Sequence, residues 1–148
     1  AWVKEQWGGK LILKGLMDAE DAAIAAGLGV DAIIVSNHGG RQLDGAPASI
    51  EVLPGIVAEV GGACEVWLDG GIRSGQDVFK AKAIGADGTL IGKAFLNGLG
   101  ALGKAGVTQC LEIIEKELDL TMAFCGKTEL SEVSSDVIYT GNPKTKTQ

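Results

Sequence analysis

Two short polar segments of the chain carry the residue types best suited to chemistry, and each follows an apolar run. The first, SNHGGRQLD, covers residues 36–44 and holds the only histidine, His38. A histidine imidazole exchanges a proton near neutral pH, so His38 is a candidate general base. Arg41 follows in the same turn and can hold a carboxylate with two parallel hydrogen bonds. A base beside a carboxylate clamp suits removal of a proton or hydride from the carbon next to a carboxylate. The alternative is a structural histidine bonded to the backbone, with Arg41 paired to Asp44, and residue types alone leave both open.

The second segment, DGGIRSG, covers residues 69–75 and is typical of an anion site. Its paired glycines allow close approach of the backbone to a ligand, and their N–H groups can point at an anion. Arg73 offers a planar donor fork for phosphate oxygens. We expect a helix to begin at Ser74 and to direct its positive dipole end at the same place. The alternative is a plain glycine turn, with Arg73 in solvent.

Residues after two other apolar runs fit the same anion site. Gly92 and Lys93 follow the last run, and barrel enzymes bind phosphate between the loops after their last two strands. Lys14 lies at the end of the first run and needs an anionic partner unless it reaches water, because an unpaired buried ammonium is costly. Asp69 can accept hydrogen bonds from ligand hydroxyls.

Apolar runs alternate with helical patterns along the chain. We expect strands at residues 10–14, 31–36, 65–69 and 87–92. We expect helices at residues 18–27, 47–61, 74–84 and 108–124, with Asp18, Ser74 and Thr108 as N-caps. Pro54 should interrupt the second helix or start a new one. Residues 1–9 suggest a partial helical turn whose tryptophans cover apolar surface, and residues 140–148 a disordered end.

Strands that are apolar throughout, each followed by a helix, predict an α/β fold with a parallel sheet and helices on its outer face. A weak internal repeat, GLGVDAIIVSNHG and AIGADGTLIGKAF, favours a (β/α) barrel over a doubly wound sheet. Four βα units make half of a (β/α)8 TIM barrel, which typically needs about 250 residues. The carboxyl ends of these strands meet on one rim, so the polar segments should lie together.

Composition narrows the function classes. Thirteen basic residues against 19 acidic ones argue against a general nucleic-acid binder. No apolar run nears the roughly 20 residues that span a bilayer, and no signal peptide opens the chain, so we expect a cytoplasmic protein. Three scattered cysteines and one histidine argue against a zinc cluster, a disulfide framework or another bound metal.

From residue 2 to 140 the sequence resembles the FMN-dependent L-2-hydroxy acid dehydrogenases and oxidases, most closely their bacterial L-lactate dehydrogenase branch. The similarity is carried by KLILKG, DAIIVSNHGGRQLDG, DGGIRSGQDVFKAKAIGAD and GKAF. It implies that residues 1–139 are the C-terminal half of a TIM barrel, followed by C-terminal helices, with FMN as cofactor. It also implies oxidation of a small L-2-hydroxy acid, L-lactate to pyruvate in the closest branch.

The resemblance implies a role for each site residue. His38 would be the base that takes a proton from the substrate, and Arg41 would hold the substrate carboxylate. Lys14 would stabilise negative charge on the reduced flavin ring, Ser36 would touch the flavin, and Asp69 would bind ribityl hydroxyls. The residues implied around the FMN phosphate are Gly70, Gly71, Ile72, Arg73, Gly92 and Lys93.

The sequence departs from the family pattern in three ways. Lys93 replaces the usual arginine and Ala94 the usual proline, and lysine neutralises phosphate only as a point charge. The N-terminal half-barrel, with the aspartate that pairs with the histidine, is not in this sequence. We therefore expect little turnover from the chain alone, and a homo-oligomer or a complement with the missing half. The family also implies possible peripheral contact with the inner membrane.

Two other functions fit parts of the same sequence pattern. IMP dehydrogenase has a similar phosphate loop, but it needs a catalytic cysteine between barrel strands. Here Cys64 precedes a strand, whereas Cys110 and Cys125 fall in the predicted outer helix. A non-catalytic half-barrel module that binds flavin or phosphate remains the alternative to an enzyme.

Overall fold

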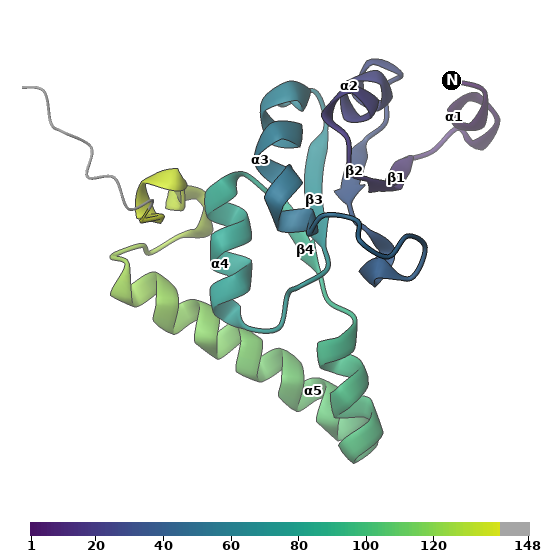
Figure 1. Ribbon diagram of the computed structural model, residues 1–148. Helices are drawn as coiled ribbons and strands as arrows, with labels where there is room; N and C mark the ends of the chain where they lie inside the picture. Colours follow the sequence, from purple (N-terminus) through teal and green to yellow (C-terminus); the bar gives the residue numbers. More distant parts are fainter. Residues whose placement is uncertain (140–148) are drawn as a thin grey trace, which may run out of the picture.

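Four short strands form a single parallel sheet in chain order, as the apolar runs predict. The computed structural model describes residues 1–139, and Figure 1 shows its elements. The strands are β1 (Ile12–Leu16), β2 (Ala32–Val35), β3 (Glu65–Asp69) and β4 (Gly88–Leu90). Each strand pairs in parallel with the next, so all four carboxyl ends lie at one edge of the sheet. The fold is therefore a run of βα units, as the sequence predicts.

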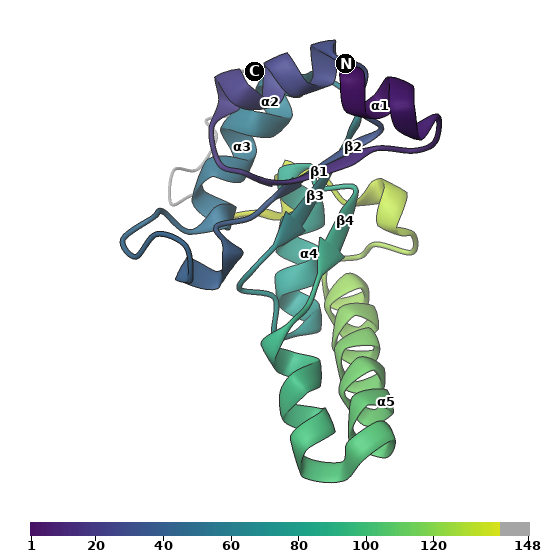
Figure 2. The same ribbon diagram turned by 90° about the vertical axis from the view of Figure 1, so that its right-hand side faces the viewer.

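Three helices pack along one side of this sheet. They are α2 (Ala19–Gly27), α3 (Ser49–Val60) and α4 (Gly75–Ile84), and each follows a strand (Figures 1 and 2). A short helix, α1 (Trp2–Trp7), precedes β1, and a long one, α5 (Lys93–Phe124), follows β4. The remaining elements are three short 3-10 helices, at His38–Gly40, Leu130–Glu132 and Ser135–Val137.

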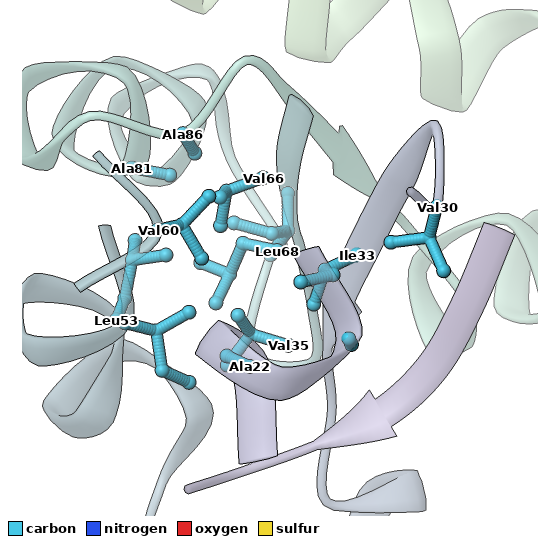
Figure 3. Packing of buried hydrophobic residues seen from close by; sticks show 13 residues of the cluster. Ala22, Val30, Ile33, Val35, Leu53, Val60, Val66, Leu68, Ala81 and Ala86 are labelled. Atoms are coloured by element: carbon cyan, nitrogen blue, oxygen red, sulfur yellow. The ribbon is translucent and has the colours of Figure 1, made fainter. Parts of the chain in front are cut away.

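The hydrophobic core lies between the sheet and these three helices (Figure 3). Alternate residues of a strand point to opposite faces of a sheet, so Ile33, Val35 and Leu68 all face the helices. These three side chains are fully buried with Leu53 and Ile56 of α3. Burying one such side chain stabilises the fold by about 1.5–3 kcal/mol. This core fixes the strands and leaves their carboxyl ends free for the loops.

The strand boundaries differ from the predicted ones. The first strand runs over Ile12–Leu16 rather than 10–14, so Lys14 lies inside it and not at its end. An irregularity in pairing falls between Lys14 and Leu16, where Gly15 has a φ of 105°. The second and fourth strands are shorter than predicted, because their terminal residues turn into the loops.

Two helix predictions need correction. The second helix is continuous over Ser49–Val60, with Pro54 inside it, since Leu53 and Ile56 anchor it to the core on both sides of the proline. The last helix begins at Lys93 and not at Thr108. It changes direction at Leu102 and Gly103, where Gly103 has a φ of 59°, and forms two arms.

The two tryptophans near the start of the chain differ from expectation. Trp2 and Trp7 do not cover apolar surface; they are 71% and 68% exposed. The predicted disordered end, residues 140–148, lies outside the described residues. No helix within residues 1–139 has the length and apolar character needed to cross a membrane.

Candidate functional site

The carboxyl ends of the four strands border one pocket of about 530 Å³. That volume falls in the range of roughly 300–1,000 Å³ typical of small-molecule sites. Residues from every strand end line it: Lys14, His38, Arg41, Asp69, Gly70, Gly71, Ile72, Arg73, Gly92 and Lys93. The structure thus brings together all the residues singled out in the sequence except Ser36, which lies buried next to the pocket.

Lys14, Ser36 and Asp69 form a hydrogen-bonded group below the pocket. The Lys14 ammonium lies 2.5 Å from Asp69 Oδ2 and 3.0 Å from Ser36 Oγ, and the Ser36 hydroxyl donates to the same carboxylate oxygen at 2.6 Å. Partial burial raises the pKa of the Asp69 carboxyl, but the hydrogen bonds from Lys14 and Ser36 and the charges of Lys14 and His38 lower it by more. The net effect is a pKa below the usual value for aspartate, so Asp69 is held ionised. Lys14 has a protein partner here, where the sequence left a ligand or water as its partner.

His38 sits in an unusual backbone conformation above this group. Its φ is 56°, and it is the one non-glycine residue with a positive φ in the described chain. Such a conformation costs of order 1–3 kcal/mol and is concentrated at functional sites. The Ser36 hydroxyl accepts from the His38 N–H at 3.1 Å, and the Asn37 side chain accepts from the Gly39 N–H at 3.0 Å. These bonds hold the turn that presents the imidazole to the pocket.

Positive charge dominates the pocket wall. Among the described residues, Arg41, Arg73 and Lys93 make no ion pair, so Arg41 is not paired with Asp44. With Lys14 they give four cations around a single carboxylate, Asp69. An anionic ligand or substrate therefore meets a complementary field.

The start of α4 is not the free anion-binding terminus that the sequence predicted. The Asp77 carboxylate accepts from the N–H groups of Arg73 and Ser74, each at 3.0 Å. Glu117, from α5, accepts from the Gly75 N–H at 2.9 Å. These protein carboxylates already accept from the N–H groups of Arg73, Ser74 and Gly75, so the N-terminus of α4 is capped by its own Asp77 and by Glu117 of α5.

Other donors remain available at the rim. Within residues 1–139, the N–H groups of Gly71 and Ile72 meet no acceptor. No side chain caps the first turn of α5, which starts at Lys93 after Gly92. The free N–H groups of a first helical turn attract anions. An anion in this pocket is therefore best placed against the glycine turn, the Arg73 side chain and the start of α5.

The structure also adds residues that the sequence did not single out. Gly39, Gln42 and Leu90 line the pocket. Gln42 lies in the segment 36–44, where its side chain could have been considered as a neutral donor, whereas Leu90 gave no signal. Within residues 1–139, no three His, Cys, Asp or Glu side chains cluster closely enough to hold a metal ion.

Comparison with known proteins shows the family to which the chain belongs. The profile of the FMN-dependent dehydrogenases matches residues 1–140. An L-lactate dehydrogenase of Caulobacter sp. strain K31 is 49% identical over 137 residues, which are 93% of this chain and 36% of that protein. An L-lactate dehydrogenase of Pseudomonas paraeruginosa is 47% identical over 135 residues, covering 91% of this chain and 35% of that protein.

Solved structures agree in fold. A structure of the monotopic membrane protein (S)-mandelate dehydrogenase has a TM-score of 0.89 and 42% identity, covering 93% of this chain and 36% of that one. A mandelate oxidase has a TM-score of 0.82 and 48% identity, covering 84% of this chain and 38% of that one. The chain thus spans a little over a third of the length of the relatives it matches and corresponds to part of their barrel. On the matched profile, the chain belongs to the FMN-dependent dehydrogenase family.

Proposed function

We propose that this chain supplies the FMN-binding and proton-transferring half of an L-2-hydroxy acid dehydrogenase that oxidises L-lactate to pyruvate. The single observation that carries the proposal is the meeting of His38, Arg41 and Arg73 in one cationic pocket at the carboxyl edge of the sheet. The relatives named L-lactate dehydrogenase support lactate as the substrate.

The residues of the pocket fit FMN. The unpaired N–H groups of Gly71 and Ile72, the Arg73 guanidinium and the Gly92–Lys93 start of α5 would hold the phosphate. Asp69 has one carboxylate oxygen, Oδ1, without a partner in the described chain, and this atom would accept from ribityl hydroxyls. Lys14 and Ser36 would lie against the ring. When bound, FMN accepts the two electrons that the substrate loses.

The chain's own residues handle the substrate. The Arg41 guanidinium binds the substrate carboxylate through a bidentate contact and so fixes the reacting carbon. The His38 imidazole then takes one of the two protons that a 2-hydroxy acid loses on oxidation to the 2-oxo acid. The resulting imidazolium faces the ionised Asp69, and their electrostatic attraction already lowers the pKa of that carboxyl. The negative charge of Asp69 thereby partly compensates the positive charge of the imidazolium.

We also propose that residues 1–139 act as one half of the barrel and need a complementary half, either the N-terminal part of a longer protein or a second copy. The turn places the imidazole in the pocket, but within the described residues no side chain accepts a hydrogen bond from the His38 ring and so fixes which nitrogen carries the proton. A catalytic histidine depends on such an orienting group. The chain with FMN alone should therefore turn over lactate at a negligible rate. We further propose that the assembled enzyme works in the cytoplasm in peripheral contact with the inner membrane, and the monotopic membrane relative supports the membrane contact.

The proposal is tested by complementation. The chain is co-expressed with the part of the Caulobacter sp. lactate dehydrogenase that precedes the matched region, and the complex is loaded with FMN. Dye reduction that depends on L-lactate and not on D-lactate is expected from the complex, and not from the chain alone. Flavin that stays bound and oxidised under L-lactate would favour the non-catalytic binding module, and a complex that binds no FMN would refute the proposal.

A further inference from the structure

The two loops that border the anion side of the pocket are also joined outside the sheet. Gly71–Arg73 lead into α4, and Gly92–Lys93 lead into α5. Figure 2 shows the two arms of α5 below the sheet, and Figure 1 shows them spreading apart from their turn, with the second arm running past α4. A connected set of close contacts therefore runs from one loop to the other through α5.

The first contact joins α4 to the second arm of α5. Glu117 accepts a hydrogen bond from the Gly75 N–H, across 42 positions of sequence. The two backbones also touch at this point, because a side chain at residue 75 would come within 2.5 Å of Ile114 O and of the Glu117 carbonyl carbon. Gly75 is buried in this contact. The start of α4 is thus seated directly on α5 and held there by one carboxylate.

The second contact joins the two arms of α5. A side chain at Gly98 would come within 2.8 Å of the Gly106 carbonyl carbon, and one at Gly106 within 2.7 Å of the Gly98 carbonyl carbon. The first arm begins at Lys93, in the pocket wall. Arg73 also lines a small cavity between the arms, beside Ala94 and Gln109. These contacts therefore connect Arg73 to Lys93 through Gly75 and the two arms of α5.

We propose that Glu117 is a positioning residue for the anion-binding rim: through Gly75 and the α5 hairpin it fixes Arg73 relative to Lys93. Glu117 itself does not line the pocket. Asp77 accepts from the Arg73 backbone N–H, whereas the Arg73 side chain makes no ion pair among the described residues and is available to a ligand. The inference rests on the proposed function, because it assigns the phosphate of FMN to this rim.

The first test compares FMN with riboflavin, which has the same ring and ribityl chain but no phosphate. Glu117→Ala is expected to weaken FMN binding by about tenfold, the effect of losing one hydrogen bond to a charged group, and to leave riboflavin binding within about twofold. Glu117→Gln keeps an oxygen acceptor and should recover part of the loss. Glu115→Gln, an exposed glutamate on the same helix, is the matched control and should behave as wild type. Equal losses for both flavins, no loss, or a gain in FMN affinity from the freed Gly75 N–H would overturn the inference.

The second test needs no flavin. Amide hydrogen exchange is followed in the full chain at Arg73 and Ser74, whose N–H groups bond to Asp77, and at Leu96, whose N–H bonds to Gly92 O in the first turn of α5. Glu117→Ala should speed exchange at all three, while core amides such as that of Leu68 stay protected. Faster exchange at Arg73 and Ser74 with unchanged exchange at Leu96, or no change at any of the three, would overturn the inference. A wild-type complex that binds FMN no better than riboflavin would instead refute the proposed function, and the exchange result would still decide the role of Glu117.

Discussion

The imidazole of His38 occupies the space that a side chain at Gly15 would need. A Cβ built on Gly15 would collide with His38 Nε2 and lie 3.1 Å from His38 Cε1. Gly15 lies in the irregular part of β1, directly after Lys14. The His38 imidazole therefore packs directly against the backbone of β1. The Lys14 side chain of the same strand reaches Asp69.

Replacing Gly15 by alanine should displace the base. We expect the lactate turnover of the complemented enzyme to fall by about 100-fold, because a displacement near 1 Å costs that much in a positioned reaction. FMN binding should change much less, since the phosphate side of the pocket lies away from Gly15. Steady-state dye reduction and flavin titration measure the two effects separately.

Gly29→Ala is the matched control for that variant. Gly29 also has a positive φ, 78°, but no atom lies within 4 Å of its missing Cβ. Both variants introduce backbone strain, but only the added methyl group of Gly15→Ala contacts His38. Equal losses of turnover in the two variants would show that strain alone explains the effect.

Asp69 should make stability depend on pH in the acid range. Its pKa is lowered in the folded chain, so its stabilising contribution is full above the unfolded-state pKa and is lost as pH falls through the lower folded-state value. Near pH 7, Asp69→Asn should lower the free energy of unfolding by about 1 kcal/mol, a modest figure because solvent screens this partly exposed pair. Urea unfolding of both proteins should show the difference shrinking only below the ordinary carboxyl range. A difference that grows as pH falls contradicts this account.

Lys93 should hold phosphate less well than an arginine would. Lys93→Arg adds a planar fork at the start of α5, so we expect FMN affinity to rise by roughly three- to tenfold, with riboflavin affinity unchanged. Lys104→Arg, in the second arm of α5 and outside the pocket wall, serves as the control. Isothermal titration with both flavins measures the change. Higher affinity for both flavins would point to a general effect on folding.

The α5 hairpin depends on two facing glycines. Gly106→Ala places a Cβ against the Gly98 backbone and should destabilise the chain by about 1–3 kcal/mol, as overpacking does. Gly100→Ala lies in the first arm with no atom within 4 Å, and should stabilise the chain by about 0.5–1 kcal/mol through helix propensity. Thermal unfolding of the two variants should therefore move in opposite directions. Stabilisation by Gly106→Ala as well as by Gly100→Ala would mean that the arms are not in contact.

Local signals in the sequence predicted those features that depend on neighbours along the chain. Asp18 caps α2 and Ser74 caps α4, as expected, because an N-cap bonds to amides two or three residues away. The grouping of strand-end residues in one pocket was also predictable, because parallel strands bring their carboxyl ends to one edge.

Long-range contacts were not predictable. The bond between Glu117 and Gly75 joins residues 42 positions apart, and no local pattern shows that α4 is already capped by α5. The early start of α5 was missed because a glycine-rich stretch has low helix propensity, whereas Gly98 and Gly106 are there to let the two arms touch. The pairing of Lys14 with Asp69 likewise depends on the sheet, which sets β1 and β3 on either side of β2.

The central claim is that His38 takes a proton from a 2-hydroxy acid held by Arg41 beside FMN. Its most direct test is a single anaerobic turnover, in which L-lactate is added to the FMN-loaded complemented enzyme and to its His38→Asn variant. The account predicts that the flavin colour bleaches rapidly in the wild type, and at least about 100-fold more slowly in the variant although FMN stays bound. Bleaching at the same rate in both proteins would contradict it.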